Sequence, residues 1–345
     1  MYKTISVDRE GYFKSSDGLR ISDAELGKLW LESLEVNDKG VCSLTYEGEY
    51  IVVEPFDKPY VAQQVYTESG LEILLPYELR CKVKLESLCL DPWDRFHGLT
   101  EKGIPFVLTS KAQAELFQLA DGFSDDSITI AHREIDTDPF YKNDQPIHDN
   151  EFWSAKYAAE EKPGWDLEGP HPALESVLPQ IKLLKGRFLV PGCGRGHDAA
   201  ALAEKGHIVT GLDFSARAVE EATKLYSQVP RLTFEQADVL NLPESYNRSV
   251  DFIFEHTCFC AIPTSQRKNL VKTWARRLDE RGHLLGVFFL HTRRGGPPYG
   301  CSEWELERLM EPYFDIRYWT RSQVSPGWRK GIELIVYAEK KRDIF

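Results

Sequence analysis

The stretch Phe188–Asp198 constrains the fold more than any other part of the chain. It contains an apolar strand, the beginning of a helix, and between them three alternating glycines, Gly192, Gly194 and Gly196. A second apolar strand, His207–Leu212, ends at Asp213. Glycines let the backbone turn tightly and approach a ligand closely, and a carboxylate at the end of the next strand can accept hydrogen bonds from both hydroxyls of a ribose. The pattern predicts a nucleoside-cofactor site at the first crossover of a doubly wound sheet.

The spacing of these glycines separates two classes of cofactor. A dinucleotide site has the pattern G-x-G-x-x-G, with the pyrophosphate at the N-terminus of the following helix. The pattern here is G-x-G-x-G, and S-adenosylmethionine (SAM) has no phosphate to hold. The sequence therefore favours SAM over NAD. A glycine-rich turn without a ligand is the remaining alternative, and the position of Asp213 argues against it.

Length and composition limit the remaining classes. A chain of 345 residues exceeds the size at which single cores usually divide, so two domains are expected. Residues 1–150 contain 15 basic and 28 acidic residues, and neither half is strongly basic, which favours a small-molecule substrate over nucleic acid. No apolar run is long enough for a membrane span, and the N-terminus lacks the apolar core of a signal peptide. The seven cysteines form no C-x-x-C pair, so we expect a cytoplasmic protein.

Residues 136–150 are polar and contain two prolines, which predicts a linker. Before it, short strand-like runs separated by turn signals predict a strand-rich α+β domain over residues 1–135. Two helices are expected in this domain, beginning at Ser22 and Ser110 as N-caps. The motifs Glu54–Asp57 and Asp91–Arg95 suit either turns with a packed aromatic side chain or a binding surface, and the first interpretation is favoured. The role of this domain does not follow from its sequence.

Strands and helices alternate over residues 151–345, which implies a parallel sheet with right-handed crossovers. The last two strands are expected near 313–321 and 331–338. The segment between them is too short for a helical crossover, so these strands should form an antiparallel hairpin. A parallel sheet with one reversed strand at its end is typical of SAM-dependent methyltransferases rather than of dinucleotide-binding enzymes.

Residues 151–340 resemble the thiopurine, thiol and halide methyltransferase family, in particular its thiol and halide branch. The resemblance rests on these motifs: Phe152–Tyr157, Pro163–Asp166, Leu189–Asp198, Gly211–Asp213, Phe259–Pro263 and Gly295–Tyr299. The Val-Pro-Gly-Cys-Gly loop and the Gly-Gly-Pro-Pro-Tyr segment are specific in combination. The resemblance implies a Rossmann-like α/β SAM-methyltransferase sheet with an antiparallel last strand, preceded here by the smaller α+β domain. It also implies methyl transfer to a soft nucleophile, usually sulfur.

The resemblance implies that Trp153 and Trp165 contact the cofactor, with Tyr157 at a position that the family often fills with tryptophan. Aromatic faces attract cations such as a sulfonium. The alternative is that these side chains fasten their segment to the core, and for Tyr157 the two interpretations are equally good. Asp238 is expected to end the third strand of the domain. There its carboxylate can accept a hydrogen bond from the adenine amino group, while the backbone N–H of Val239 reaches a ring nitrogen.

The fourth strand ends at Glu255 and His256, where the family often has Asp-Tyr, and this departure leaves the substrate open. An imidazole ordinarily has a pKa of about 6.5, so His256 can take a proton from a thiol. Packing of His256 against the cofactor is the alternative. An arginine in the loop after the fifth strand, Arg293 or Arg294, can attract an anionic nucleophile or can simply be solvated. The expected substrate contacts are Phe259, Arg293, Tyr299 and Trp328.

Together these observations predict a SAM-dependent methyltransferase that acts on a small soft nucleophile. A thiol is the first choice of acceptor, and halide, tellurite and thiopurine are the alternatives. A SAM-binding sensor or pseudoenzyme, whose N-terminal domain binds a protein partner, is the alternative in another class. No metal is expected, because no second pair of ligands at metal spacing accompanies Cys258 and Cys260.

Overall fold

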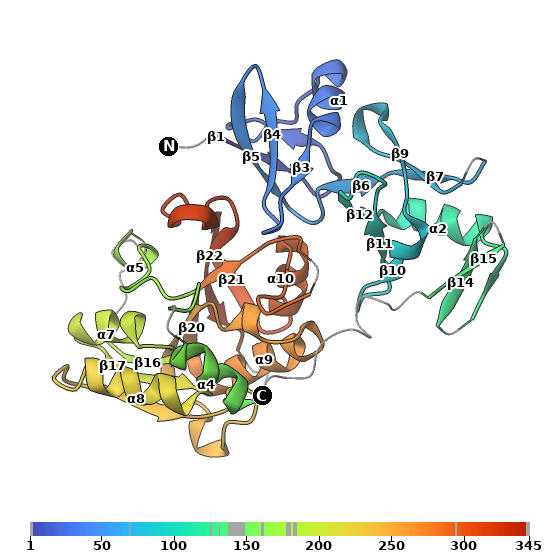
Figure 1. Cartoon of the computed structure of the whole chain (residues 1–345). Helices are drawn as coiled ribbons and strands as arrows, with labels where there is room; N and C mark the ends of the chain where they lie inside the picture. Colours follow the sequence, from blue (N-terminus) through green and yellow to red (C-terminus); the bar gives the residue numbers. More distant parts are fainter. Residues whose placement is uncertain are drawn as a thin grey trace. The chain divides into compact units, whose positions relative to one another are not determined.

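The computed structural model of the chain describes residues 3–68, 70–124, 126–130, 132–136, 149–159, 162–176, 181, 185–293 and 295–342. The chain forms two compact units (Figure 1). Unit 1 comprises Met1–Asp144, Leu290–Gly295 and Gly300–Leu306, and unit 2 comprises Gln145–Phe289, Gly296–Tyr299 and Glu307–Phe345. The boundaries of the folding domains, 1–135 and 151–345, stay a prediction, and residues 137–148 of the expected linker lie outside the described residues.

Unit 1 is built mainly from short β-strands. The described strands form sheets of the orders β2-β1-β5-β4-β3, β10-β11-β12-β6, β13-β14-β15 and β7-β8-β9. Their bounds are β1 Lys3–Val7, β2 Phe13–Lys14, β3 Glu35–Val36, β4 Cys42–Tyr46, β5 Glu49–Pro55, β6 Tyr60–Ala62, β7 Gln64–Tyr66, β8 Glu72–Leu74, β9 Arg80–Lys82, β10 Cys89–Leu90, β11 Phe96–Leu99, β12 Pro105–Leu108, β13 Gly122–Phe123, β14 Ser127–Ile130 and β15 Arg133–Asp136. The unit also contains the α-helices α1 (Ala24–Glu32) and α2 (Ser110–Leu119) and the short 3₁₀ turns η1 (Pro76–Glu78) and η2 (Leu85–Ser87).

The expected N-caps of both helices in unit 1 are wrong by one residue. Asp23, not Ser22, caps α1, because its side chain accepts a hydrogen bond from the backbone N–H of Leu26. Thr109, not Ser110, caps α2, because its hydroxyl accepts from the N–H of Ala112. In each case two capping residues stand next to each other in the sequence. The propensity of either for the N-cap does not decide between them.

Unit 2 contains a seven-stranded sheet of the order β18-β17-β16-β19-β20-β22-β21. Its strands are β16 Arg187–Pro191, β17 Ile208–Asp213, β18 Leu232–Gln236, β19 Val250–His256, β20 Leu278–Phe289, β21 Phe314–Arg321 and β22 Glu333–Lys340. The first five strands in chain order pair in parallel, whereas β22 is antiparallel to both β20 and β21. The antiparallel last strand is therefore confirmed. It lies inside the sheet, since β21 takes the edge.

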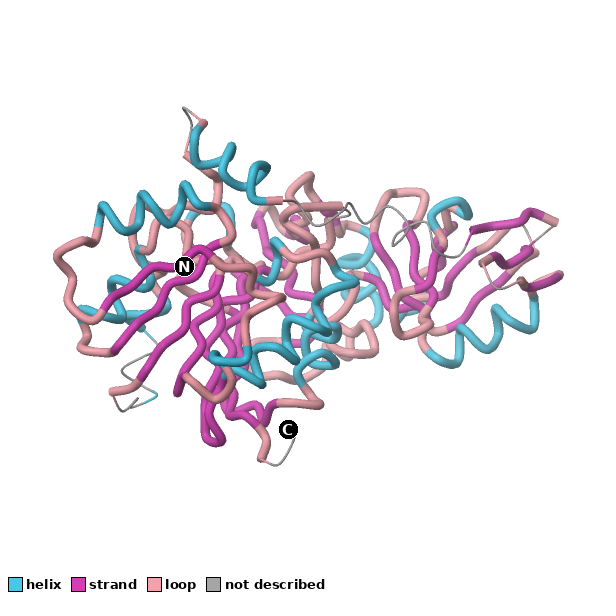
Figure 2. Tube along the Cα trace, turned by 90° about the horizontal axis from the view of Figure 1, so that it is seen from below, coloured by secondary structure: helices cyan, strands magenta, loops and turns pink. Residues whose placement is uncertain are grey.

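Helices α7 His197–Glu204, α8 Ala216–Leu225 and α9 Thr264–Arg277 connect parallel strands of unit 2. Helices α4 Asn150–Ala158 and α5 Ala173–Ser176 precede β16, and α10 Glu303–Met310 lies between β20 and β21, with its first residues in unit 1. The 3₁₀ turns are η3 Glu244–Tyr246, η4 Phe259–Ala261 and η5 Gly327–Arg329. The strand order runs outward in opposite directions from β16 and β19. Right-handed connections therefore place α7 and α8 on one face of the sheet and α9 on the other. Figure 2 shows helices on both sides of the strands.

The apolar pattern of β16 explains its central place. Phe188, Leu189 and Val190 are each at most 2 % exposed, as expected for a parallel strand that is covered on both faces. β16 ends where its apolar run ends, at the glycines. Because β16 pairs in parallel with β17 and β19, the carboxyl ends of these three strands lie at the same edge of the sheet. Among the described residues, no helix combines the length and the apolar character that crossing a membrane requires.

Candidate active site

The glycine bend, Gly192–Gly196, joins β16 to α7. The φ angles of Gly192, Gly194 and Gly196 are 59°, 54° and 81°, a region that residues with a side chain rarely adopt. A Cβ at Gly196 would lie 2.5 Å from Cζ of Phe234, and one at Gly192 would lie 2.8 Å from Cβ of Cys258. The bend therefore needs glycine both for its conformation and for its close packing.

Asp213, the last residue of β17, holds the glycine bend in place. Its carboxylate accepts hydrogen bonds from the backbone N–H groups of Gly194 at 2.8 Å and Ser215 at 2.9 Å. Burial raises the pKa of Asp213, although these bonds oppose the shift. Each carboxylate oxygen can accept a second hydrogen bond, so Asp213 can hold the bend and still accept from two hydroxyl groups.

Three aromatic side chains from the segment before β16 gather beside the bend. The Trp165 indole N–H donates to the Tyr157 hydroxyl at 3.2 Å, and the rings of Trp153 and Trp165 pack edge to face with centroids 5.8 Å apart. A Cβ at Gly194 would lie 3.1 Å from the Tyr157 hydroxyl oxygen. The structure thus brings these predicted cofactor residues together over the bend, an arrangement that suits both interpretations of Tyr157.

Asp238 lies two residues beyond β18, which ends at Gln236, so the expectation that Asp238 ends the strand is wrong. The reason is local. Its carboxylate accepts from the N–H of Leu240 at 2.9 Å and from the side-chain amide of Asn241 at 2.6 Å, which closes a turn after the strand. Val239 in this turn is buried. Binding of adenine by Asp238 and Val239 stays a prediction.

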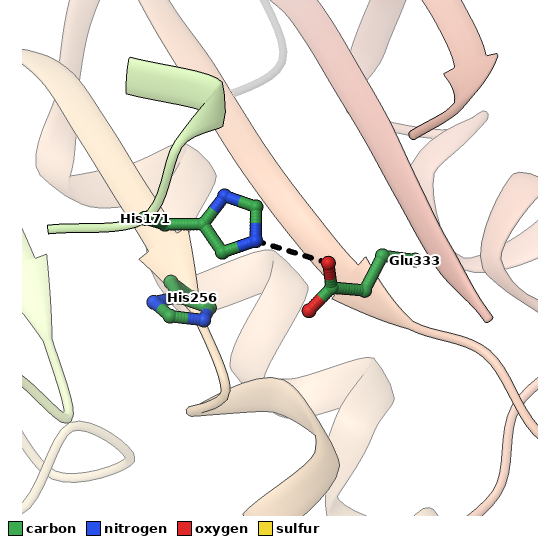
Figure 3. Close-up of side chains that lie close together, drawn as sticks. All are labelled: His171, His256 and Glu333. Carbon is green, nitrogen blue, oxygen red and sulfur yellow. Dashed lines mark hydrogen bonds and ion pairs between the residues drawn. The ribbon is translucent and has the colours of Figure 1, made fainter. Parts of the chain in front are cut away.

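Five polar side chains from separate segments form what we call the buried polar cluster. They are His171 before α5, Asp198 on α7, His256 at the end of β19, Arg329 in η5 and Glu333 at the start of β22. Figure 3 shows three of them, with both imidazoles near the Glu333 carboxylate. His171, Arg329 and Glu333 are at most 2 % exposed.

The contacts of the cluster assign a proton to each imidazole. His256 Nδ1 lies 2.8 Å from an oxygen of Asp198, so it carries the proton, and its Nε2 accepts from the Arg329 guanidinium at 3.0 Å. His171 Nδ1 accepts from the backbone N–H of Ala173 at 3.1 Å, so its Nε2 carries the proton and donates to Glu333 at 3.0 Å. Both imidazoles are therefore neutral in this arrangement.

Among the described residues, His171, His256 and Glu333 form the one group whose ligand atoms lie within 4.8 Å of one another, close enough to share a metal ion. The hydrogen bonds do not favour a metal there. His171 carries its proton on Nε2, the nitrogen that faces Glu333, and Arg329 brings a positive charge 3.0 Å from His256 Nε2. The same atoms are better explained by the hydrogen bonds that they already make.

Both carboxylates of the cluster are charged. Burial alone would raise the pKa of Asp198, but His256 beside it holds that pKa below its ordinary value. Burial alone would also raise the pKa of Glu333, but the hydrogen bond from His171 holds that pKa below its ordinary value. The adjacent Glu255 differs, because burial raises its pKa to about 8, so it is uncharged at pH 7.

Two of the four residues predicted to contact the substrate, Phe259 and Tyr299, are buried in unit 2. Phe259 is fully buried in unit 2, where it packs against Phe288 and Trp274. The backbone N–H of Tyr299 donates to the carbonyl of Cys260 at 2.7 Å.

Two further residues expected to contact substrate are more exposed. The Trp328 ring packs on Phe289 and is 42 % exposed. Arg293 is exposed and belongs to unit 1, and the alternative Arg294 lies outside the described residues. Contact of the four predicted residues with a substrate stays a prediction.

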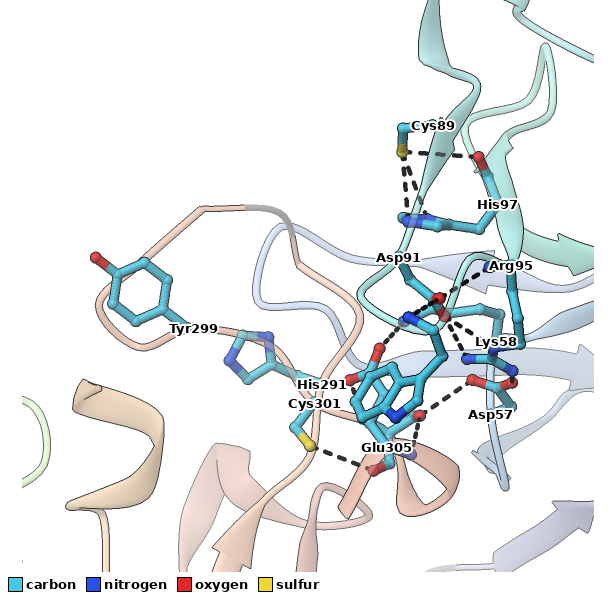
Figure 4. Close-up of polar contacts among 12 residues, drawn as sticks. Asp57, Lys58, Cys89, Asp91, Arg95, His97, His291, Tyr299, Cys301 and Glu305 are labelled. Carbon is cyan, nitrogen blue, oxygen red and sulfur yellow. Dashed lines mark hydrogen bonds and ion pairs between the residues drawn. The ribbon is translucent and has the colours of Figure 1, made fainter. Parts of the chain in front are cut away.

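The two N-terminal motifs meet in unit 1 (Figure 4). Asp91 closes a turn by accepting from the N–H groups of Trp93 at 2.9 Å and Arg95 at 3.0 Å. Arg95 also donates to Asp57 at 2.6 Å, and Trp93 packs edge to face on Trp304. These contacts support the interpretation as turns with a packed aromatic side chain.

Sequence reasoning missed most of the buried polar cluster. Glu333 carried a usable signal, because it interrupts the apolar run Ile332–Val336, and a charge buried in a strand needs a partner. Asp198 lies at the end of the motif Leu189–Asp198, but the motif alone assigns no function to its side chain. His171 lies between two prolines without any periodic pattern, and its place in the cluster depends on the tertiary fold.

Residues 148–341 match the thiopurine S-methyltransferase family. This match covers more than half of the chain. The chain belongs to this family. The resemblance seen in the sequence motifs is therefore confirmed, and with it the assignment as a SAM-dependent methyltransferase.

Individual relatives carry different descriptions. A probable thiol methyltransferase 2 of Arabidopsis thaliana is 34 % identical over 190 residues, which cover 52 % of this chain and 81 % of the relative. Thiocyanate methyltransferase 1 of Brassica oleracea is 34 % identical over 152 residues, or 43 % of this chain and 66 % of the relative. A solved structure of the Burkholderia thailandensis 1,6-didemethyltoxoflavin-N1-methyltransferase, with S-adenosylhomocysteine bound, overlaps 55 % of this chain and 81 % of its own at 20 % identity and a TM-score of 0.42.

The residues present fit the SAM of a methyltransferase. Asp213 at the glycine bend retains acceptor capacity for hydroxyl groups, and the aromatic faces of Trp153, Tyr157 and Trp165 gather beside the bend, where they suit a sulfonium. Asp198, on the first turn of α7, and His256, at the carboxyl end of β19, add charge and a titratable nitrogen at the edge of the sheet where ligands of such folds bind.

Proposed function

We propose that this methyltransferase transfers the methyl group of SAM to the sulfur of a small thiol. One observation carries the proposal: the family match over residues 148–341, within which a relative named as a probable thiol methyltransferase is 34 % identical over 81 % of its length. The buried polar cluster agrees with a thiol, because it offers an imidazole held by a carboxylate, and a thiol must lose a proton to become a strong nucleophile.

In this proposal the residues of unit 2 hold the two reactants. The glycine bend and Asp213 hold the methionine and ribose parts, and Asp238 and Val239 hold the adenine. Trp153, Tyr157 and Trp165 cover the cofactor and exclude water. When bound, SAM supplies an electrophilic methyl group on a sulfonium. Correct orientation of two reactants can contribute about 7–11 kcal/mol to such a displacement, so positioning by these side chains is the main contribution of the protein.

On the acceptor side we propose that His256 takes the thiol proton and that Phe259, Tyr299 and Trp328 shape the site. Thiocyanate is the acceptor named for one relative, so an anion that needs no deprotonation is the competing class, together with halide and tellurite. Thiopurine is a third class, named by the family itself.

An acceptor panel tests the proposal. Purified protein is incubated with SAM and, separately, small thiols, a thiopurine, thiocyanate, iodide and tellurite, and the release of S-adenosylhomocysteine is measured. The proposal predicts the highest kcat/KM with a thiol. Faster turnover of thiocyanate or iodide would transfer the assignment to the anionic acceptors, and tight binding of SAM with no turnover of any acceptor would favour a sensor.

We also propose a cytoplasmic location and a role of the N-terminal residues in binding a protein partner. The seven cysteines are free thiols, which agrees with a reducing compartment. The family match begins at residue 148, so it does not describe the N-terminal residues.

A further inference from the structure

We propose that the buried polar cluster is a charge-compensating proton store: it balances the sulfonium cation before methyl transfer and takes up the thiol proton on His256 Nε2 once that cation is gone. This inference rests on the proposed function and concerns the same site. It assigns roles to His171, Asp198, Arg329 and Glu333 as positioning residues for His256, and it identifies the acceptor as one that carries a removable proton.

The charge of the cluster is the first argument. Asp198 and Glu333 are both ionised, Arg329 provides one positive charge, and the contacts of His171 and His256 make both imidazoles neutral. The cluster therefore carries one net negative charge. Side chains buried to this extent interact strongly with a nearby charge, because little water screens them. One added cation neutralises the cluster.

Arg267, a buried cation that acts on Glu255, donates to the backbone carbonyls of Ile262 and Tyr299. Glu255 and the thiols of Cys258 and Cys260 are acidic groups that can only be neutral or negative. Glu255 on the same strand is uncharged at pH 7, since burial raises its pKa to about 8. Burial also raises the pKa of the Cys260 thiol to about 12 and that of the Cys258 thiol well above its ordinary value, so both thiols are neutral. The positive charge comes from a ligand or from a proton.

His256 is the group that can take the proton. His171 Nδ1 accepts a backbone N–H, so a second proton there would cost that hydrogen bond. Among the described residues, His256 Nε2 accepts only from Arg329, and the same nitrogen of Arg329 also donates to Glu333 at 3.3 Å. Arg329 further donates to the carbonyl of Trp165 at 2.9 Å. The guanidinium can therefore release His256 and keep both of its other acceptors.

The charge and the atoms balance in the complete step. The S–H bond of the thiol breaks, its proton bonds to His256 Nε2, and its electron pair stays on sulfur. That sulfur bonds the methyl carbon, and the electron pair of the broken sulfonium–methyl bond remains on the sulfur of S-adenosylhomocysteine. The sulfonium charge disappears while the cluster gains one proton, so the site stays neutral throughout. The proton leaves to water with the products.

Binding calorimetry tests the inference without turnover. SAM and S-adenosylhomocysteine are titrated separately into the full chain at pH 7, in two buffers of different ionisation enthalpy, which gives the number of protons taken up with each ligand. We expect the neutral S-adenosylhomocysteine to bring more proton uptake than SAM. The affinity ratio of SAM to S-adenosylhomocysteine should rise with pH, because loss of the proton from His256 Nε2 restores the negative charge of the cluster.

Three variants separate the roles. In His256→Asn the extra proton uptake should vanish and the affinity ratio should become independent of pH, while the preference for SAM remains because the cluster keeps its negative charge. In Asp198→Asn, or in Glu333→Gln, which repeats the test if the first variant fails to fold, the preference for SAM should fall about tenfold. His132→Asn, an exposed position in unit 1, is the matched control and should behave as the wild type.

SAM or S-adenosylhomocysteine can itself gain or lose a proton on binding. That contribution is the same in the wild type and in His256→Asn, so it cancels when the proton uptake of the two proteins is compared. Equal proton uptake with both ligands in the wild type, or a difference that persists in His256→Asn, would overturn the inference while leaving the proposed function intact. A protein that binds neither ligand would instead contradict the proposed function.

Discussion

Replacing Glu255 by glutamine tests the electrostatics of the site in the protein without ligands. Glu255 is 1 % exposed, and one of its oxygens accepts from the N–H of Phe259 at 3.0 Å. The other oxygen has no hydrogen-bond partner among the residues that the structure describes. A glutamine amide keeps the acceptor for Phe259 and cannot ionise. The variant therefore removes the titration with little change of shape.

The sign and size of the effect follow from the pKa. Burial raises the pKa of Glu255 from 4.5 to about 8, so the folded protein holds one more proton than the unfolded chain between these values. Stability should then fall as the pH rises through this range, by about 1.4 kcal/mol per pH unit. Over the whole shift the loss reaches about 5 kcal/mol as an upper bound. The Glu255→Gln variant should not show this loss.

Chemical denaturation at several pH values between 4.5 and 9 measures the effect. We expect Glu255→Gln and the wild type to be similar near pH 4.5, and the variant to be more stable by several kcal/mol at pH 9. Glu244→Gln, an exposed position in unit 2, is the matched control and should follow the wild type. An equal pH dependence in Glu255→Gln and the wild type would refute the reasoning, and with it the statement that Glu255 is uncharged beside the cluster.

Four other outcomes are expected. Asp213→Ala should weaken SAM binding at least about tenfold, because a charge-assisted hydrogen bond is lost; an unchanged calorimetric Kd would count against the ribose assignment. Gly196→Ala should cost about 2–3 kcal/mol, since φ is 81° and the new Cβ would lie 2.5 Å from the Phe234 ring; a Tm within about 2 °C of the wild type would contradict this. Lys58→Met should destabilise unit 1 by about 3–5 kcal/mol, because it removes the cation 3.0 Å from Glu305, whose pKa is lowered to about 2; denaturation of Lys58→Met/Glu305→Met should recover most of the loss, and a double variant as unstable as the single one would disprove the pairing. His256→Asn should lower kcat/KM for a thiol by about 100-fold and leave methylation of thiocyanate, which carries no proton, nearly unchanged; equal losses for both would exclude His256 as the base.

The sequence was sufficient for the sheet and for the cofactor class because both depend on local patterns. The apolar run at Phe188–Val190, the glycines and Asp213 are close in the chain, and their spacing alone implies a bend between a strand and a helix. The hairpin at the end of the chain followed from the short segment between its strands. The place of β22 inside the sheet did not follow, since the length of a connection does not say on which side of β20 a strand pairs.

The buried polar cluster could not be derived from the sequence for the same physical reason. His171 and Glu333 form a hydrogen bond across 162 residues of sequence, and no periodicity links them. His256 was singled out by its place at the end of a strand, yet its carboxylate partner Asp198 lies on a different element. The proton positions, and hence the net charge, depend on contacts that only the assembled fold provides.

Methyl transfer with a labelled donor tests the central claim most directly. Purified protein is incubated with SAM that carries a trideuterated methyl group and with the best thiol of the panel, and the products are analysed by mass spectrometry. The account predicts a thioether with the deuterated methyl group on sulfur and one molecule of S-adenosylhomocysteine for each thioether. Bound SAM that remains intact, or a label found on an atom other than the acceptor sulfur, would contradict it.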